Sequence, residues 1–150
     1  MSQEINSIIE KRAAKRELLH NLSLLIARIG IASLMLVHGF PKMIQLLSGD
    51  PVAFPAVMGM NAQTSLTLAV LAEVLCSVLI LVGLKTRIST IPLIITMLVA
   101  VFSIHSDGPF AKQELGLLYL LVYLALLLAG GGKYSTDYFL HKRSVHPITA

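Results

Sequence analysis

The sequence predicts an all-α membrane protein, an antiparallel four-helix transmembrane bundle with both termini in the cytoplasm. The 150 residues are 55% hydrophobic and only 13% charged, with a mean hydropathy of +0.78. Soluble domains carry about 25% charged residues, so this chain lacks the charge to cover a surface that faces water. The apolar residues also fall into four blocks, each long enough for a helix that crosses a bilayer. These observations exclude a soluble globular enzyme and a disordered chain.

The chain begins with a basic segment, residues 1–21, that we expect to form an amphipathic helix in the cytoplasm. Isoleucines and leucines are set there among Lys11, Arg12, Lys15 and Arg16. Each Lys or Arg beside anionic lipid contributes about 1 kcal/mol to membrane binding. We therefore expect the segment to lie on lipid head groups, and docking of a cytoplasmic partner is the alternative.

The next region, residues 22–140, is predicted to be one transmembrane domain. Its four expected spans are about 22–40, 64–84, 88–105 and 114–131. The very short link at 85–87 makes the second and third spans antiparallel neighbours. A short cytoplasmic tail, residues 141–150, follows the domain.

The connection between the first two spans, Pro41 to Gln63, is long and rich in apolar residues. Such a segment is not expected to extend into water. We expect it to fold onto the outer face of the bundle as an interfacial helix or a cap.

Basic residues predict the orientation of the chain. If the helices alternate, one side holds Lys11, Arg12, Lys15, Arg16, Lys85, Arg87, Lys133, Lys142 and Arg143, and the other holds only Lys42 and Lys112. The positive-inside rule then places both termini in the cytoplasm. The net charge of +4 is thus a topology signal, and no nucleic-acid partner is expected. We expect a multi-pass protein of the bacterial cytoplasmic (inner) membrane.

Ionisable residues in or beside the spans are the candidate functional residues, because a charge at the bilayer centre costs about 2.5–3.5 kcal/mol. The candidates for ligand binding are Arg28, His38, Lys42, Glu73, His105 and Glu114. With a rise of 1.5 Å per residue, all except Arg28 fall in the outer half of the bilayer. We therefore expect a polar pocket there, with the connection at 41–63 as its lid.

Glu73 has two interpretations at this stage. It either binds a ligand or a proton, or pairs with Arg28 as a structural lock, since the depths of the two residues differ by only about 5 Å. His38 is likewise either a hydrogen-bond donor to a bound head group or an interfacial histidine. Lys42 can snorkel to the interface, and His105 and Glu114 lie at loop junctions where polar residues are common.

The sequence contains no metal site or established catalytic motif. Its single cysteine, Cys76, excludes an intramolecular disulfide, a CxxC pair and a Cys-rich metal cluster. A Walker loop, a dinucleotide-binding fingerprint and HExxH are absent. The stretch GGGKYSTD after the fourth span predicts a helix stop and a turn, with Ser135 as the cap of a short tail helix.

Several motifs resemble those of the DoxX family of small four-helix membrane proteins. They are ARIGIASLMLVHGFPK, with Arg28 and an HGxxK core; MGMNAQTSLTLAVLAEVL, with Glu73; LVGLKTR; a histidine-bearing third span; and GGGKYSTD. Residues 1–21 and 140–150 lie outside the resemblance. The family is named for a subunit linked to thiosulfate oxidation with quinone as acceptor. Other members are similar to partners in catechol, thiol or oxidative-stress resistance, and eukaryotic relatives look like receptor chaperones.

The resemblance implies either an enzyme subunit or an assembly factor, since a fold alone does not decide function. Our first hypothesis is a quinone-binding subunit of a membrane redox or stress-response system, at most an oxidoreductase subunit that needs a partner enzyme. His38 or His105 would donate to a carbonyl, Lys42 would stabilise negative charge and Glu73 would relay a proton. The alternative is a non-enzymatic assembly factor or scaffold for a partner membrane protein. A small transporter, requiring a homodimer, and a b-type haem protein that binds haem through His38 and His105 are less favoured.

Overall fold

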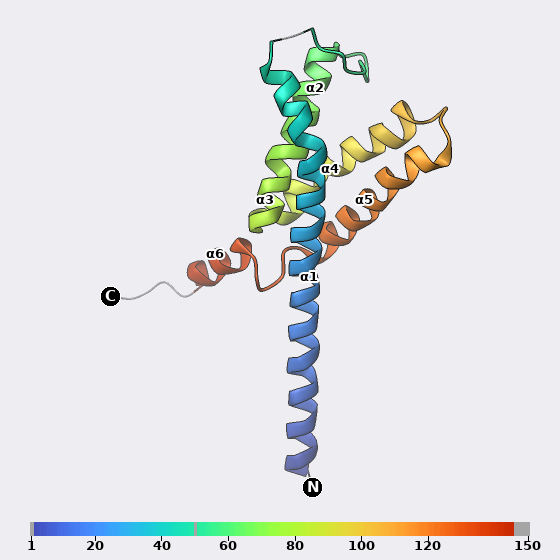
Figure 1. Cartoon of the computed structure of the whole chain (residues 1–150). Coiled ribbons are helices and arrows are strands. Elements are labelled where there is room, and N and C mark those ends of the chain that lie inside the picture. The colour runs from blue at the N-terminus through green and yellow to red at the C-terminus, as the bar shows by residue number, and fades with distance from the viewer. Residues whose placement is uncertain (1, 50, 146–150) are drawn as a thin grey trace.

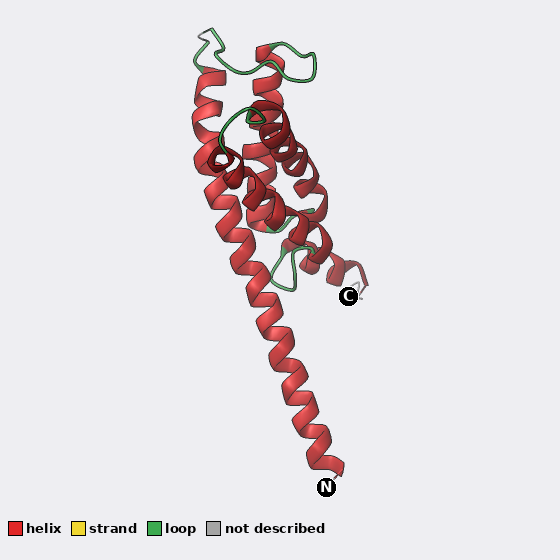
Figure 2. Cartoon of the chain, turned by 90° about the vertical axis from the view of Figure 1, so that its right-hand side faces the viewer, coloured by secondary structure: helices red, strands yellow, loops and turns green. Residues whose placement is uncertain are grey.

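The computed structural model describes residues 2–49 and 51–145, which are helical apart from their connections (Figures 1 and 2). The chain is 81% helix, with no strand among the described residues. The elements are α1 (Ser2–Leu47), α2 (Ala62–Val70), η1 (Leu71–Cys76), α3 (Ser77–Val82), α4 (Thr86–Val99), η2 (Ala100–Ile104), α5 (Phe110–Ala129) and α6 (Thr136–Val145).

Four helical stretches are long and apolar enough to cross a membrane, which confirms the four predicted spans. They are Gln3–Leu47, Ala62–Val82, Thr86–Ile104 and Phe110–Ala129. The second span begins before its apolar block because Asn61 caps it and accepts a hydrogen bond from the Thr64 amide at 2.7 Å. The chain is therefore a multi-pass membrane protein.

Helix α1 continues past the expected end of its span. It runs without interruption from the basic segment through the first span and past Pro41 to Leu47, so the interfacial helix expected from residue 41 is not a separate element. A proline removes only one helical hydrogen bond and is tolerated in transmembrane helices. Figure 1 shows the N-terminal part of α1 extending well beyond the other helices. Residues 3–20 are exposed along this extension.

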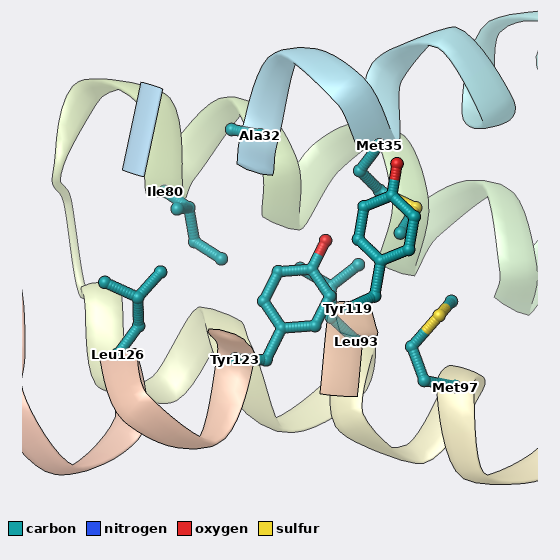
Figure 3. Close-up of a cluster of buried hydrophobic side chains, with 8 residues drawn as sticks. All are labelled: Ala32, Met35, Ile80, Leu93, Met97, Tyr119, Tyr123 and Leu126. Atoms are coloured by element: carbon teal, nitrogen blue, oxygen red, sulfur yellow. The ribbon is translucent and has the colours of Figure 1, made fainter. Parts of the chain in front are cut away.

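The core of the bundle is a cluster of buried side chains drawn from four helices. Its members are Ala32, Met35, Ile80, Leu93, Met97, Tyr119, Tyr123 and Leu126. Figure 3 shows both tyrosine rings pointing from α5 into this cluster. The two rings are stacked at a centroid distance of 6.1 Å, which fixes the inward face of α5.

Two of the spans contain a π-helical segment that no periodicity in the sequence indicated. The second span is α-helical at both ends with η1 between them, and the third span ends in η2. A π-helix bonds each amide to a carbonyl five residues away and occurs often at functional sites. Each segment therefore changes which residues its helix turns toward the bundle interior.

Arg28 closes the end of the bundle that is nearer to the chain termini. Its side chain is 1% exposed and donates hydrogen bonds to the Ile80 carbonyl at 3.2 Å and the Tyr134 carbonyl at 2.6 Å. The hypothesis that Arg28 pairs with Glu73 is thus wrong. A guanidinium carries five N–H donors, so Arg28 can bond at the same time to a carbonyl of α3 and to one in the segment before α6.

Asp137 completes this closure, which we call the tail clasp and define by Arg28, Gly83, Thr86 and Asp137. Gly83, with φ of 75°, ends α3, and the carboxylate of Asp137 accepts from the amides of Lys85 at 2.6 Å and Thr86 at 2.9 Å. The carboxylate thereby caps the N-terminus of α4 from a distant part of the chain. Ser135 accepts from the Tyr138 amide at 3.3 Å, which confirms it as the cap of α6.

Asp137→Ala is expected to lower the free energy of unfolding by about 1–2 kcal/mol, because two amides at the start of α4 lose their acceptor. Thermal unfolding of the purified protein in detergent measures the loss. Glu10→Ala, on the exposed part of α1, is the matched control and should leave the unfolding temperature unchanged. Equal unfolding temperatures for the two variants would show that the clasp does not stabilise the bundle.

Candidate functional site

A cavity of about 160 Å³ lies toward the end of the bundle that carries the turn between η2 and α5. Its polar lining residues are His38, Lys42, Glu73, His105, Lys112 and Tyr119. The structure thus brings together four of the six residues that the sequence singled out. They come from α1, from η1 and from the residue after η2, although they are far apart in the chain.

An ion pair between Lys42 and Glu73 is the central polar contact of this cavity. Lys42 Nζ lies 2.5 Å from Glu73 Oε1, and the side chains are 31% and 2% exposed. The second oxygen, Glu73 Oε2, is buried without a hydrogen-bond partner among the described residues. A buried carboxylate oxygen in that state is available to accept a hydrogen bond from a ligand.

Gly39 on α1 allows η1 to come close enough for the pair to form. A methyl group at this position would lie 2.9 Å from Val74 Cγ2 and 3.1 Å from Glu73 Cβ, so α1 and η1 would have to move apart or repack to admit it. Small residues allow transmembrane helices to approach in this way. Because Lys42 follows His38 by four residues, both side chains lie on the face of α1 that Gly39 brings near η1.

Gly116 has the same role on the opposite side of the cavity. A methyl group there would lie 2.6 Å from Val101 Cγ2, so the glycine lets α5 approach η2. The polar residues Lys112 and Tyr119 lie on the same face of α5, four residues before and three residues after Gly116. This spacing in the sequence is the signal that could have identified them as site residues.

The aromatic ring of Tyr119 forms one wall of the cavity. The His38 imidazole meets it edge to face, with centroids 5.9 Å apart and an interplanar angle of 86°. Tyr123 stacks on Tyr119 and is fully buried in the core. Tyr119 therefore belongs to both the core and the cavity wall, whereas Tyr123 belongs to the core alone.

A second cavity of about 150 Å³ lies on the other side of the ion pair and shares Lys42, Glu73 and Ala100 with the first. Its remaining lining is mostly apolar and includes Phe54, Val57, Met58 and Met60 of the α1–α2 connection. The connection was expected to cover the polar pocket. The connection lines this apolar cavity instead. Because α1 continues to Leu47, the connection begins beyond the first cavity.

Two sequence candidates lie outside both cavities. Arg28 belongs to the tail clasp, and Glu114 is exposed on α5. The described residues contain no group of three or more His, Cys, Asp and Glu side chains that could hold a metal ion. The chemistry that the first cavity offers is therefore hydrogen bonding and charge, from two lysines, two histidines, a tyrosine and one carboxylate.

Comparison with known proteins found one family and one relative. The family model for DoxX matches residues 23–106, which include His38, Lys42, Glu73 and His105 but not α5 or the tail. A protein of Haemophilus influenzae, named only as an uncharacterized protein, is 30% identical over 117 residues. That alignment covers 73% of this chain and 84% of the relative. No solved structure matches the chain.

Lys42→Met is expected to destabilise the protein by about 2 kcal/mol or more, because it leaves the carboxylate of Glu73 buried and unpaired. A fully buried pair loses about 3–5 kcal/mol when one partner is removed, and the exposed third of Lys42 reduces this cost. Chemical unfolding in detergent measures the change. The double variant Lys42→Met/Glu73→Gln should recover most of the lost stability; equal losses in the single and double variants would contradict the pairing.

Proposed function

Because the chain belongs to the DoxX family, we propose that it binds a quinone in the first cavity as a subunit of a membrane redox system. The observation that supports this proposal is a ring-sized cavity in an apolar bundle whose polar groups converge from three spans and the turn after η2. A cavity of about 150 Å³ is large enough to hold a benzene ring. The two carbonyl oxygens of a quinone need hydrogen-bond donors.

The donor set fits such a ring. His38, Lys42, Lys112 and His105 all line the cavity and can donate to carbonyl oxygens, and the ring of Tyr119 offers a face for stacking. The lysines outnumber the single carboxylate, so the cavity favours a ligand that is anionic or gains negative charge. Glu73 lines the cavity, and its Oε2 is buried without a hydrogen-bond partner among the described residues, as expected where a ligand or proton binds after a small rearrangement.

A bound quinone would supply an acceptor for two electrons and two protons. Residues of the chain would relay the protons, one at a time through Glu73, and supply positive charge, while the electrons would come from a partner enzyme. Lys42 is shared between Glu73 and the cavity, so it can turn its charge from the carboxylate to the ligand. Glu73 then holds a proton at Oε2 in place of its contact with Lys42.

The apolar second cavity supports entry of the ligand from the bilayer. Leu68 and Ile95 line it and are about half exposed on the surface that faces lipid. An apolar molecule dissolved in the membrane reaches the ion pair from this side without crossing a polar surface. With the termini in the cytoplasm of a bacterium, as the basic residues predict, both cavities lie in the outer half of the inner membrane.

Glu73→Gln is expected to reduce the quinone retained by the protein at least tenfold, because the variant loses the carboxylate and frees Lys42 from its partner. Mass spectrometry of small molecules extracted with the protein in native lipid discs measures the retained quinone. Glu114→Gln makes the same chemical change on the exposed surface of α5 and should retain quinone as the wild type does. Bulk lipid alone in all three samples would overturn the proposal.

The alternative function is an assembly factor or scaffold, and the extension of α1 favours it. Residues 3–20 are exposed on a helix that protrudes from the bundle, with isoleucines and leucines among the exposed side chains. An apolar helix surface of this kind is suited to a partner protein.

Deletion of residues 2–15 is expected to abolish co-purification of a partner if the chain is a scaffold. This deletion keeps Glu17, whose carboxylate pairs with Lys133 and anchors the helix to the tail. Size-exclusion chromatography with intact-mass analysis compares the two forms. A monodisperse full-length protein without any stoichiometric partner would contradict the scaffold function.

A further inference from the structure

An open groove of about 950 Å³ lies at the end of the bundle opposite the two cavities, where the Gly130–Gly132 turn meets the start of α4 and α6. Its charged lining residues are Lys85, Arg87, Lys133 and Asp137, and His141 and Tyr138 also line it. We propose that this groove binds the phosphate group of an anionic phospholipid. The proposal is independent of the quinone site.

Two of the cations in the groove are not neutralised by a neighbouring carboxylate. Lys133 is paired with Glu17, and both carboxylate oxygens of Asp137 accept from amides at the start of α4. Lys85 and Arg87 form no ion pair with a described residue. A phosphate, which carries negative charge and several acceptor oxygens, matches such a pair of cations.

Arg87 is held in place along the wall of the groove. One of its terminal nitrogens donates to the Leu128 carbonyl at 3.0 Å, and its Nε would lie 3.1 Å from a methyl group added at Gly130. The glycine therefore leaves room for the guanidinium beside the backbone. The remaining guanidinium donors are available to an oxygen ligand.

The groove lies at the depth where phospholipids place their phosphates. Thr86 begins the third membrane-length helix and Ala129 ends the fourth, so the groove adjoins the limit of the hydrocarbon region. The exposed aromatic residues Tyr134, Tyr138 and Phe139 lie in or just before α6, and Tyr138 lines the groove. Tyrosine is enriched at this boundary in membrane proteins, which supports the same placement.

The apolar part of the groove favours a lipid over a free anion. Ile88 is 63% exposed and lines the groove beside Arg87, and Tyr138 lines it from α6. These side chains can contact the glycerol and acyl groups that accompany a lipid phosphate. Basic pockets between transmembrane helices are known to hold anionic lipid head groups.

Lys85→Asn tests the proposal without straining the backbone. Lys85 has φ of 49°, a left-handed conformation that asparagine tolerates well. One lysine beside a phosphate contributes about 1 kcal/mol, so removing it is expected to weaken binding about fivefold. Native mass spectrometry with short-chain phosphatidylglycerol measures the affinity, and Lys15→Gln removes the same charge from the exposed part of α1 as the control.

The expected result is a stoichiometric phosphatidylglycerol adduct on the wild type and on Lys15→Gln, weakened about fivefold in Lys85→Asn and further in Lys85→Glu. Phosphatidylcholine, which is neutral overall, should bind more weakly to all forms. Equal losses in Lys85→Asn and Lys15→Gln would mean general attraction to charge and would overturn the site. Displacement of the lipid by an equal concentration of inorganic phosphate would overturn its assignment to lipid. An unfolding temperature of Lys85→Asn equal to that of the wild type shows that its weaker binding of lipid does not result from a loss of stability.

Discussion

A carboxylate in the interior of an apolar bundle needs a positive partner, and this constraint organises one half of the protein. Glu73 is 2% exposed and is paired with Lys42 across the contact between α1 and η1. The contact requires Gly39, because a larger residue would keep the helices apart. The pair then divides the interior into a polar and an apolar cavity, so the positions of both follow from it.

The two ends of the bundle use polar residues in different ways. At the tail clasp, Arg28 donates to the carbonyls of Ile80 in α3 and Tyr134 before α6, and Asp137 accepts from two amides at the start of α4. At the other end, polar side chains face a cavity and Glu73 keeps one oxygen without a partner. The residues that carry the family resemblance therefore include two that hold the fold together, Arg28 and Asp137, and others, such as Glu73, that can contact a ligand.

The side chains that line the first cavity determine the chemistry that it can offer a ligand. The cavity has proton donors, acceptors and positive charge, but the described residues include no metal-binding cluster that could carry electrons. Under the proposed function, the chain positions and protonates a quinone while a partner transfers electrons. Both π-helical segments contribute residues to the wall of this cavity, which agrees with the frequent occurrence of π-helices at functional sites.

The sequence by itself determined the membrane-spanning class and the four spans, because hydropathy and helical rise depend only on local order. It also predicted that five ionisable residues converge in the outer half, of which His38, Lys42, Glu73 and His105 line the cavity and Glu114 does not. It left the partner of Glu73 open between Arg28 and a ligand, and it did not reveal the inward faces of α4 and α5. Those depend on contacts between residues distant in the chain. Only the tertiary structure decided that Glu73 pairs with Lys42 and that Arg28 belongs to the clasp, since helices of nearly uniform apolar surface are oriented by packing rather than by composition.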